Sequence, residues 1–273
     1  MDRTRTAGQW MRWAWRWWQQ PVAHRVDEVG AVIAARKSGR LPWNVFKGSL
    51  VASDAAEPLE IRDFGAGSGP SGKTRLTTLG ALESTASSDW RKAKWLWAFA
   101  QVQSAGRPDG PVDILELGTC LGAGAVSMAL GAGNRCRYVG LEGSPGLAAL
   151  TEARLHRAAP GADVELRVGP FEETLPLLLA SDRHFDLVFL DGHHEGPALL
   201  AQWSQLAPRL KPGAWVVVDD IRWSKGMHAA WGQLASVEGV IALDLFRMGA
   251  LRVSRPEEDG SRGPKRVPLP LLA

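Results

Sequence analysis

The segment Asp113-Ile-Leu-Glu-Leu-Gly-Thr-Cys-Leu-Gly-Ala-Gly-Ala125 decides the fold of this chain. Its first five residues are apolar enough for a short buried strand, the glycines Gly118, Gly122 and Gly124 follow, and a helical pattern opens at Ala125. A strand, a glycine turn and a helix form the first part of a βαβ unit. This arrangement presents backbone N–H groups at a helix N-terminus, where a negative group of a ligand is favoured.

A second strand, from Tyr138 to Glu142, follows about twenty residues later and ends in an acid. In folds that bind dinucleotides, an acid at the end of this strand holds the hydroxyls of a ribose. We therefore expect a nucleoside to bind between the glycine turn and Glu142.

The composition of the 273 residues sets the class of protein, since 45% are hydrophobic and 22% charged, enough apolar material for a real core. The formal net charge of +3 is too small to indicate nucleic-acid binding. Two cysteines, Cys120 and Cys136, exclude a disulfide scaffold and favour a reducing compartment. With no apolar run of about 20 residues and no signal-peptide pattern, a cytoplasmic location without transmembrane segments is expected.

Strands and helices alternate after the turn at residues 106–111, which predicts an α/β fold. We expect a Rossmann-like, doubly wound, mostly parallel seven-stranded sheet, preceded by an N-terminal helical extension. Two residues separate the last two strands, too few for a crossover, so these strands should form an antiparallel hairpin. The predicted parts are an extension or lid (1–105), a core (106–255) and a flexible tail (256–273). The predicted strands span 113–118, 138–142, 164–168, 185–191, 214–219, 240–245 and 248–253, and the predicted core helices span 123–131, 145–156, 171–180, 196–206 and 226–235.

The N-terminal extension begins with an unusual aromatic segment, because five of the 13 tryptophans lie in residues 10–18, WMRWAWRWW. One interpretation is an interfacial membrane helix or a surface for stacking nucleic-acid bases. We favour a terminal helix that packs on the body or on a second copy, which makes a homodimer plausible. Helices are also expected over 22–37 and, as one or two helices, over 75–105, whereas 54–60 reads as a polar loop.

A glycine-rich segment, residues 63–74, contains a letter-for-letter match to G-x-x-x-x-G-K-[ST] at Gly67, Gly72, Lys73 and Thr74. This motif cradles phosphates with backbone N–H groups and presents a lysine and a hydroxyl to a nucleotide and its Mg²⁺. The preceding residues carry three charges, unlike a buried parallel strand. A P-loop phosphotransferase is therefore the alternative function, and a chance match in a flexible loop the simpler interpretation.

Acids and imidazoles follow several predicted strands at the point where each strand ends. Since ligands bind outside the carboxyl ends of the strands in open α/β sheets, these side chains are the candidates for the site. They are Glu116, Glu142, Asp191, Asp219 and Asp220, with His193 and His194 close behind Asp191.

Four motifs in order resemble those of class I S-adenosylmethionine-dependent methyltransferases, in particular the catechol O-methyltransferase-like branch. They are Glu116-Leu-Gly-Thr-Cys-Leu-Gly122, the acid Glu142, Phe185-Asp-Leu-Val-Phe-Leu-Asp191 and Leu210-Lys-Pro-Gly-Ala-Trp-Val-Val-Val-Asp-Asp220, within residues 112–253. Residues 63–68 and 219–231 resemble an uncharacterised bacterial group of such enzymes. The resemblance implies O-methylation of a small-molecule hydroxyl. It also implies a set of residues for the methyl donor: Glu116, Gly118, Thr119, Cys120, Gly122, Glu142, Gly143 and Asp191.

The resemblance also implies a possible metal site. In the metal-dependent branch, an Asp after the fourth strand and an Asp-Asn pair after the fifth hold Mg²⁺, and these places carry Asp191, Asp219 and, instead of Asn, Asp220. A hard divalent cation accepts a further carboxylate oxygen. Hydrogen-bonding acids without a metal are the other interpretation, and both stay open.

A general base completes the expected site. The family has a lysine three residues after the fourth-strand acid, and this chain has His194 there. Imidazole accepts a proton near neutral pH, so His194 and Asp191 are the catalytic candidates. The pair His193 and His194 could also help bind a softer metal such as Zn²⁺ or Fe²⁺, or be ordinary loop residues. A further hypothesis is a non-catalytic adaptor that binds a partner through its N-terminus.

Overall fold

The computed structural model describes residues 27–50, 56, 58–63, 73–86, 90–254 and 265–268. The predicted aromatic helix of residues 1–20 and the glycine-rich residues 64–72 lie outside this range. Within it, no helix combines the length and the apolar character needed to span a bilayer.

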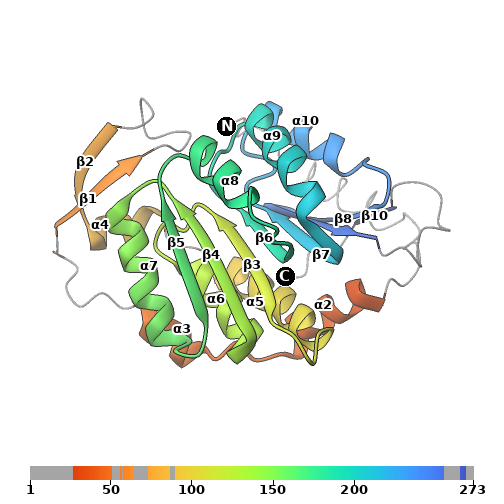
Figure 1. Cartoon of the computed structure of the whole chain (residues 1–273), viewed down its shortest axis with the longest axis horizontal. Helices are drawn as coiled ribbons and strands as arrows, with labels where there is room; N and C mark the ends of the chain where they lie inside the picture. The colour runs from red at the N-terminus through yellow and green to blue at the C-terminus, as the bar shows by residue number, and fades with distance from the viewer. Residues whose placement is uncertain are drawn as a thin grey trace, which may run out of the picture.

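A central sheet with the strand order β10-β8-β9-β7-β6-β3-β4-β5 forms the middle layer of the molecule (Figure 1). The strands β3, β4, β5, β6 and β7 run parallel, β9 runs antiparallel to both β7 and β8, and β10 runs parallel to β8. The predicted seven strands and their final antiparallel hairpin are thus confirmed. Their bounds are β3 (Val112–Leu117), β4 (Cys136–Glu142), β5 (Asp163–Val168), β6 (Phe185–Leu190), β7 (Leu210–Val218), β8 (Val240–Leu245), β9 (Met248–Val253) and β10 (Lys265–Pro268).

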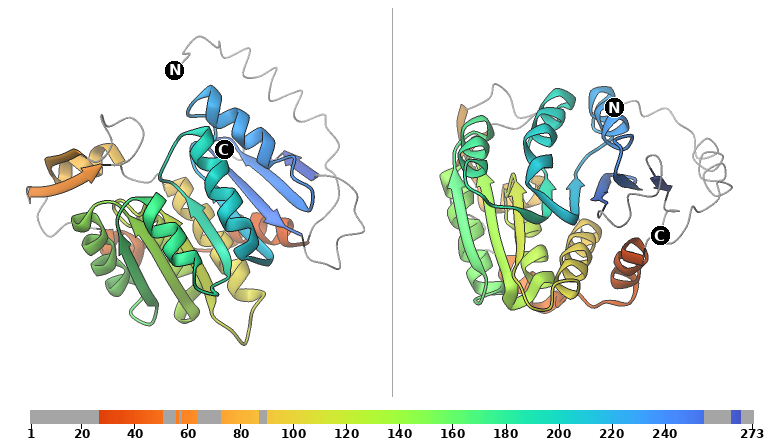
Figure 2. Two further views of the ribbon diagram at one scale, coloured as in Figure 1. Left: turned by 45° about the horizontal axis from the view of Figure 1, so that its top comes forward. Right: turned by 45° about the vertical axis from the view of Figure 1, so that its right-hand side comes forward.

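Helices cover both faces of this sheet because the buried strands place alternate side chains on opposite faces. In β3, Ile114 packs with the helices α5 and α6, whereas Leu115 and Leu117 pack with α8, α9 and α10 on the other face. Figure 2 shows the two helical layers on either side of the sheet. The helix bounds are α5 (Trp90–Ala105), α6 (Ala123–Ala132), α7 (Pro145–Ala158), α8 (Phe171–Leu179), α9 (Gly196–Leu206) and α10 (Lys225–Leu234).

The N-terminal part contains strands as well as helices, contrary to the expectation. An antiparallel hairpin takes in residues 58–60 of the expected polar loop and residues 75–78 of the segment expected to be helical. The helices expected in the rest of 75–105 are present at 79–86 and 90–105. In its first strand, apolar and charged residues alternate from Leu59 to Arg62, and Ile61 faces a small apolar cluster with Leu79 and Leu147. The bounds here are α2 (Asp27–Ser38), α3 (Trp43–Leu50), β1 (Pro58–Asp63), β2 (Lys73–Thr78) and α4 (Leu79–Ala86).

One buried arginine fastens this N-terminal part to the glycine turn. Arg154, on α7, donates to the carbonyl oxygen of Leu121 in the turn and to that of Leu50 at the end of α3, at 2.6 and 2.8 Å. It also pairs with Glu83 on α4 at 2.8 Å. The division of the chain at residue 105 remains a prediction. Nevertheless α5, on its N-terminal side, contributes Leu96 and Phe99 to the main core.

The strand β10 is a second departure from the expectation, because it lies in the tail that we expected to be flexible. It pairs with β8 over four residues, from Lys265 opposite Ile241 to Pro268 opposite Asp244. This pairing extends the sheet by one strand beyond the predicted seven.

Candidate active site

The carboxyl ends of β3, β4, β6 and β7 meet at one edge of the sheet, which we call the carboxyl edge. Gly118 donates its N–H to the end of β4, Asp191 to the end of β3 and Asp219 to the end of β6, each over 2.9 Å. These hydrogen bonds continue the sheet just past the strands and fix where the following side chains begin. The acids predicted from the sequence therefore start from a rigid edge.

The glycine turn lies in the middle of this edge and has no room for side chains. Gly118 has a φ of 89°, and a Cβ there would lie 2.6 Å from the carbonyl oxygen of Asp191. Gly122, with a φ of 73°, is the N-cap of α6. The positive φ angles of Gly118 and Gly122 are ones that glycine adopts more readily than any other residue. A Cβ on Gly124 would collide with the carboxyl group of Glu116. The turn is thus closely packed backbone, with Glu116 buried directly beneath it.

Glu116 is 1% exposed and accepts a short hydrogen bond from the hydroxyl of Tyr138 on β4. Burial raises the pKa of Glu116 to about 8, although the Tyr138 hydroxyl and the Lys92 ammonium act in the opposite direction. The carboxyl group is therefore largely protonated at neutral pH. A cationic ligand group beside it would favour its ionised form.

Glu142 is held in place by the backbone around it. Its two carboxylate oxygens accept the N–H of Cys120 at 2.9 Å and the N–H of Ser144 at 3.0 Å, and the hydroxyl of Thr119 lies 3.4 Å from one of them. Burial raises the pKa of Glu142, and the backbone hydrogen bonds oppose this rise. The structure thus brings together four predicted donor-site residues, Thr119, Cys120, Glu142 and the adjoining Gly143. A carboxylate held this way can accept two hydroxyl groups without rearranging.

Lys92, which the sequence analysis did not single out, lies between two of the predicted metal ligands. Its ammonium nitrogen is 3.0 Å from Oδ2 of Asp191 and 2.6 Å from Oδ2 of Asp219. It comes from the first turn of α5 and lies 5.8 Å from the centre of the Phe189 ring. All three charged side chains are largely buried, with exposed fractions of 16%, 19% and 4%.

The ionisation of this group follows from its contacts. Burial favours neutral lysine, but the two carboxylates outweigh it and raise the pKa of Lys92 above its usual value, so the ammonium is charged at neutral pH. Burial and the neighbouring charge of Asp219 raise the pKa of Asp191. Burial acts in the same direction on Asp219, yet Lys92 and the hydrogen bonds to it lower the pKa of Asp219 overall. The ammonium and the Asp219 carboxylate therefore form the charged pair at the centre.

The three predicted metal ligands do not form one set. Asp220, with a φ of 48°, points toward Arg247, whose guanidinium lies 3.3 Å from its carboxylate. The ammonium of Lys92 fills the space between the other two acids. In the part of the chain that the structure describes, no three His, Cys, Asp or Glu side chains are arranged to hold a metal ion. In this arrangement these residues do not fit a divalent cation, and the joint ligand set of Asp191, Asp219 and Asp220 stays a prediction.

The two histidines after β6 have different neighbours. His194 packs against the ring of Trp223, 5.6 Å between centres, and burial lowers its pKa despite the nearby charges of Asp220 and Asp219. His193 instead packs edge-on against Phe171. His194 is thus a largely neutral imidazole beside the acids, able to accept a proton.

The P-loop interpretation is wrong. Lys73 and Thr74 lie in β2, paired antiparallel with Asp63 and Arg62 of β1. A phosphate-binding lysine and threonine should begin a helix whose N-terminus faces the phosphates. A strand in a two-stranded hairpin cannot supply that arrangement.

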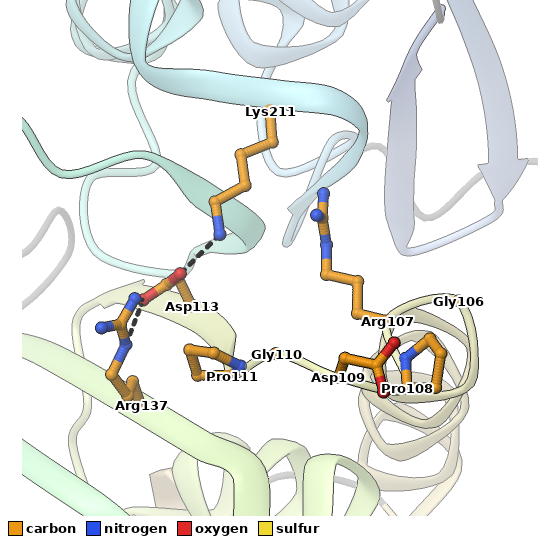
Figure 3. A pocket seen from close by; sticks show the side chains of 9 residues that line it. All are labelled: Gly106, Arg107, Pro108, Asp109, Gly110, Pro111, Asp113, Arg137 and Lys211. Atoms are coloured by element: carbon orange, nitrogen blue, oxygen red, sulfur yellow. Dashed lines mark hydrogen bonds and ion pairs between the residues drawn. The ribbon is translucent and has the colours of Figure 1, made fainter.

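The amino ends of the same strands form a second charged cluster, at what we call the amino edge (Figure 3). Lys211 lies between Asp113 and Asp186, and its nitrogen is 2.8 Å from Asp186. Arg137 pairs with Asp113 at 2.6 Å, and Arg107 pairs with Asp186. A cavity adjoins this cluster, but ligands of open α/β sheets bind at the carboxyl ends of strands. We therefore place the active site at the opposite edge.

A family model described as a methyltransferase domain matches residues 115–221. The chain is 40% identical over 109 residues to a catechol O-methyltransferase of Mycobacterium tuberculosis, covering 40% of this chain and 47% of that protein. It spans about half the length of the curated relatives it matches.

Two solved structures share the fold. The cofactor-bound protein Rv0187 from MTB is 24% identical with a TM-score of 0.56, over 87% of this chain and 99% of that one. An O-methyltransferase from Bacillus cereus in complex with SAH is 21% identical with a TM-score of 0.54, over 64% and 86%. The Rossmann-like methyltransferase fold of the described core is thus established.

Proposed function

We propose that this chain, whose residues 115–221 form a class I S-adenosylmethionine-dependent methyltransferase domain related to catechol O-methyltransferases, transfers a methyl group from S-adenosylmethionine to a hydroxyl oxygen of a small molecule. The observation that carries the proposal is Glu142. Its carboxylate is held by two backbone N–H groups at the end of β4, beside the glycine turn. This is the place and the chemistry for binding a ribose through its hydroxyls.

The remaining donor contacts follow from the same edge. We assign the amino-acid end of the donor to Glu116 and to the backbone of the turn at Gly118, and the ribose to Glu142. Glu116 is buried and largely protonated, and the cationic end of the donor would favour its ionised carboxylate form. Thr119, Cys120, Gly122 and Gly143 shape the walls of this donor site. When bound, S-adenosylmethionine supplies a methyl carbon on a positively charged sulfur.

The acceptor side contains the base. We assign His194 as the group that takes the proton of the acceptor hydroxyl, because its imidazole is largely neutral and lies beside the acids of β6 and β7. The oxygen then forms its bond to the methyl carbon while the carbon–sulfur bond breaks, and the electron pair remains on sulfur. A base of this kind contributes about 10²–10⁴-fold. Asp191 acts on the acceptor through Lys92, whose position it fixes.

The proposal is tested by calorimetric titration of the full chain with S-adenosylmethionine and, separately, with ATP. We expect micromolar binding of the donor and no heat from ATP. Glu142→Ala should weaken donor binding by about 10–100-fold, since it removes hydrogen bonds to a charged group. The matched control is Glu165→Ala on β5, where the carboxylate pairs with Arg167 and Arg183 away from the turn. Unchanged affinity in Glu142→Ala would refute the ribose assignment.

The oligomeric state and location rest on the sequence alone. We propose that the aromatic residues 10–18 contact a second copy of the chain, and that the protein is cytoplasmic. Light scattering of the full chain and of a chain lacking residues 1–20 tests the first statement. A dimer that persists without those residues would contradict it.

A further inference from the structure

Lys92 breaks an ordinary rule of helix composition. A cation in the first turn of a helix faces the positive end of the helix dipole, which is unfavourable. Lys92 is the third residue of α5, and its side chain nevertheless lies largely buried. Asp191 and Asp219 explain this position, because the Asp219 carboxylate provides the opposite charge and both side chains accept hydrogen bonds that a buried ammonium requires.

The Lys92 ammonium occupies the point between two acids at which a divalent metal ion would bind the acceptor. Asp191 and Asp219 stand at the ends of the neighbouring strands β6 and β7, and both turn an Oδ2 atom toward the same nitrogen. Two carboxylates that converge on one point form the usual start of a divalent-cation site. Here that point belongs to a side chain of the protein, beside the His194 base.

We propose that Lys92 is the resident cation of this active site, standing where a divalent ion would bind and holding the acceptor oxygen as it loses its proton. The proposal rests on the proposed function. It adds a catalytic residue from α5, outside the residues matched by the family model. The proton leaves to the imidazole of His194, and the ammonium keeps its three hydrogens throughout.

The number of donors on an ammonium group limits what the site can recognise. A lysine ammonium has three N–H donors. Among the described residues, two of them go to Asp191 and Asp219. The remaining N–H can hold one oxygen, whereas a six-coordinate Mg²⁺ offers several positions to the same acceptor. The site thus selects an acceptor through a single hydroxyl group and does not need two adjacent ones.

The core around Lys92 holds the ammonium in place. On α5, Lys92 precedes Leu96 and Phe99 at helical spacing, and both are fully buried. Phe189, on β6, lies below the ammonium and closes that side with an aromatic ring. A fixed charge that need not reorganise during the reaction is the most effective kind of electrostatic stabilisation.

The test measures Mn²⁺ binding by electron paramagnetic resonance, on the full chain after treatment with a chelator, with and without S-adenosylmethionine. Three proteins are compared: the wild type, Lys92→Ala and Lys211→Ala. The last is a matched control, because Lys211 also lies between two aspartates, yet Arg107 and Arg137 remain there to neutralise them. Thermal unfolding of each variant shows whether it is folded.

We expect no micromolar Mn²⁺ site in the wild type or in Lys211→Ala, and a site at least about tenfold tighter in Lys92→Ala. A Mn²⁺ site in the wild type that Asp219→Asn removes would overturn the proposal, and this measurement requires no folded Lys92 variant. A folded Lys92→Ala that gains no site would overturn it too, because the two acids would then not form a cation site. Failure of the wild type to bind S-adenosylmethionine would instead refute the proposed function.

Discussion

The two edges of the sheet carry the same arrangement of charged side chains in different surroundings. At each edge a lysine lies between two aspartates: Lys92 between Asp191 and Asp219 at the carboxyl edge, and Lys211 between Asp113 and Asp186 at the amino edge. At the amino edge, Arg107 and Arg137 bring the balance to three cations for two acids. At the carboxyl edge, one ammonium serves two acids, and the buried acids Glu116 and Glu142 lie close by.

We infer from this difference that the amino edge is a structural cluster and that the carboxyl edge is the proposed functional one. The amino edge is neutralised by its own arginines and fastens β3, β6 and β7 together. The carboxyl edge has more acid than base. Burial raises the pKa of Glu116, Glu142 and Asp191 there, and a neighbouring acid adds to the rise at Glu116 and at Asp191. Such an edge favours a ligand that arrives with positive charge, and the sulfonium donor of the proposed reaction is one.

The largest expected effect comes from exchanging the two lysines for methionine. Lys92→Met should lower the turnover of methyl transfer by about 10³-fold, since it removes one stabilising donor from the acceptor oxygen, and should leave donor affinity unchanged. Lys211→Met should keep turnover within about twofold and lower the free energy of unfolding by about 1–3 kcal/mol. Single-turnover kinetics and urea unfolding measure the two quantities. Equal losses of turnover in both variants would erase the distinction between the edges.

The pH dependence of stability should differ in sign between the edges. Glu116 has a pKa raised to about 8 from 4.5, so its contribution is full below pH 4.5 and is lost as the pH rises toward 8, by at most about 1.4 kcal/mol per pH unit. Burial raises the pKa of Asp113, but Arg137 and Lys211 lower it overall, so its contribution is lost as the pH falls.

Urea unfolding of the unliganded chain between pH 3 and 9 measures both slopes. Glu116→Gln should flatten the profile between pH 4.5 and about 8, and Asp113→Asn should flatten its acid end. A Glu116→Gln profile identical to that of the wild type would show that this carboxyl group ionises normally.

The smallest expected effect belongs to Asp220. Its partner Arg247 has a side chain that is 65% exposed, and surface ion pairs contribute about 0–1 kcal/mol. Asp220→Asn should therefore change the free energy of unfolding by less than about 0.5 kcal/mol and turnover by less than about twofold. A large loss of turnover that added Mg²⁺ alters would restore Asp220 to a metal site.

The core of the fold could be predicted because its signals are local. The glycine turn after β3 and the acids Glu142 and Asp191 each stand at the end of a short apolar run. The final hairpin follows from the two residues between its strands. In a parallel sheet, such strand ends meet at one edge whatever the order of the strands, so the carboxyl edge could be predicted from the sequence as well.

The N-terminal hairpin and Lys92 could not be predicted in the same way. In β1, charged residues alternate with apolar ones. In β2, the single apolar residue is Leu76, which is 78% exposed, so no buried run marks either strand. Lys92 meets its partners 99 and 127 residues further along the chain. The one local signal was a lysine on the same helical stripe as Leu96 and Phe99, where a charge requires a buried partner.

The Lys92 ammonium is part of α5 and is therefore present as soon as the chain is synthesised, whereas a metal ion must be bound from solution. Binding sites built from carboxylates and imidazoles hold copper and zinc more tightly than manganese, so a protein that recruits its metal depends on which metals its surroundings supply. Lys92 removes that dependence, because no wrong ion can be inserted and no chelator can withdraw the right one. The same methyl transfer would then proceed equally well under metal starvation and metal excess.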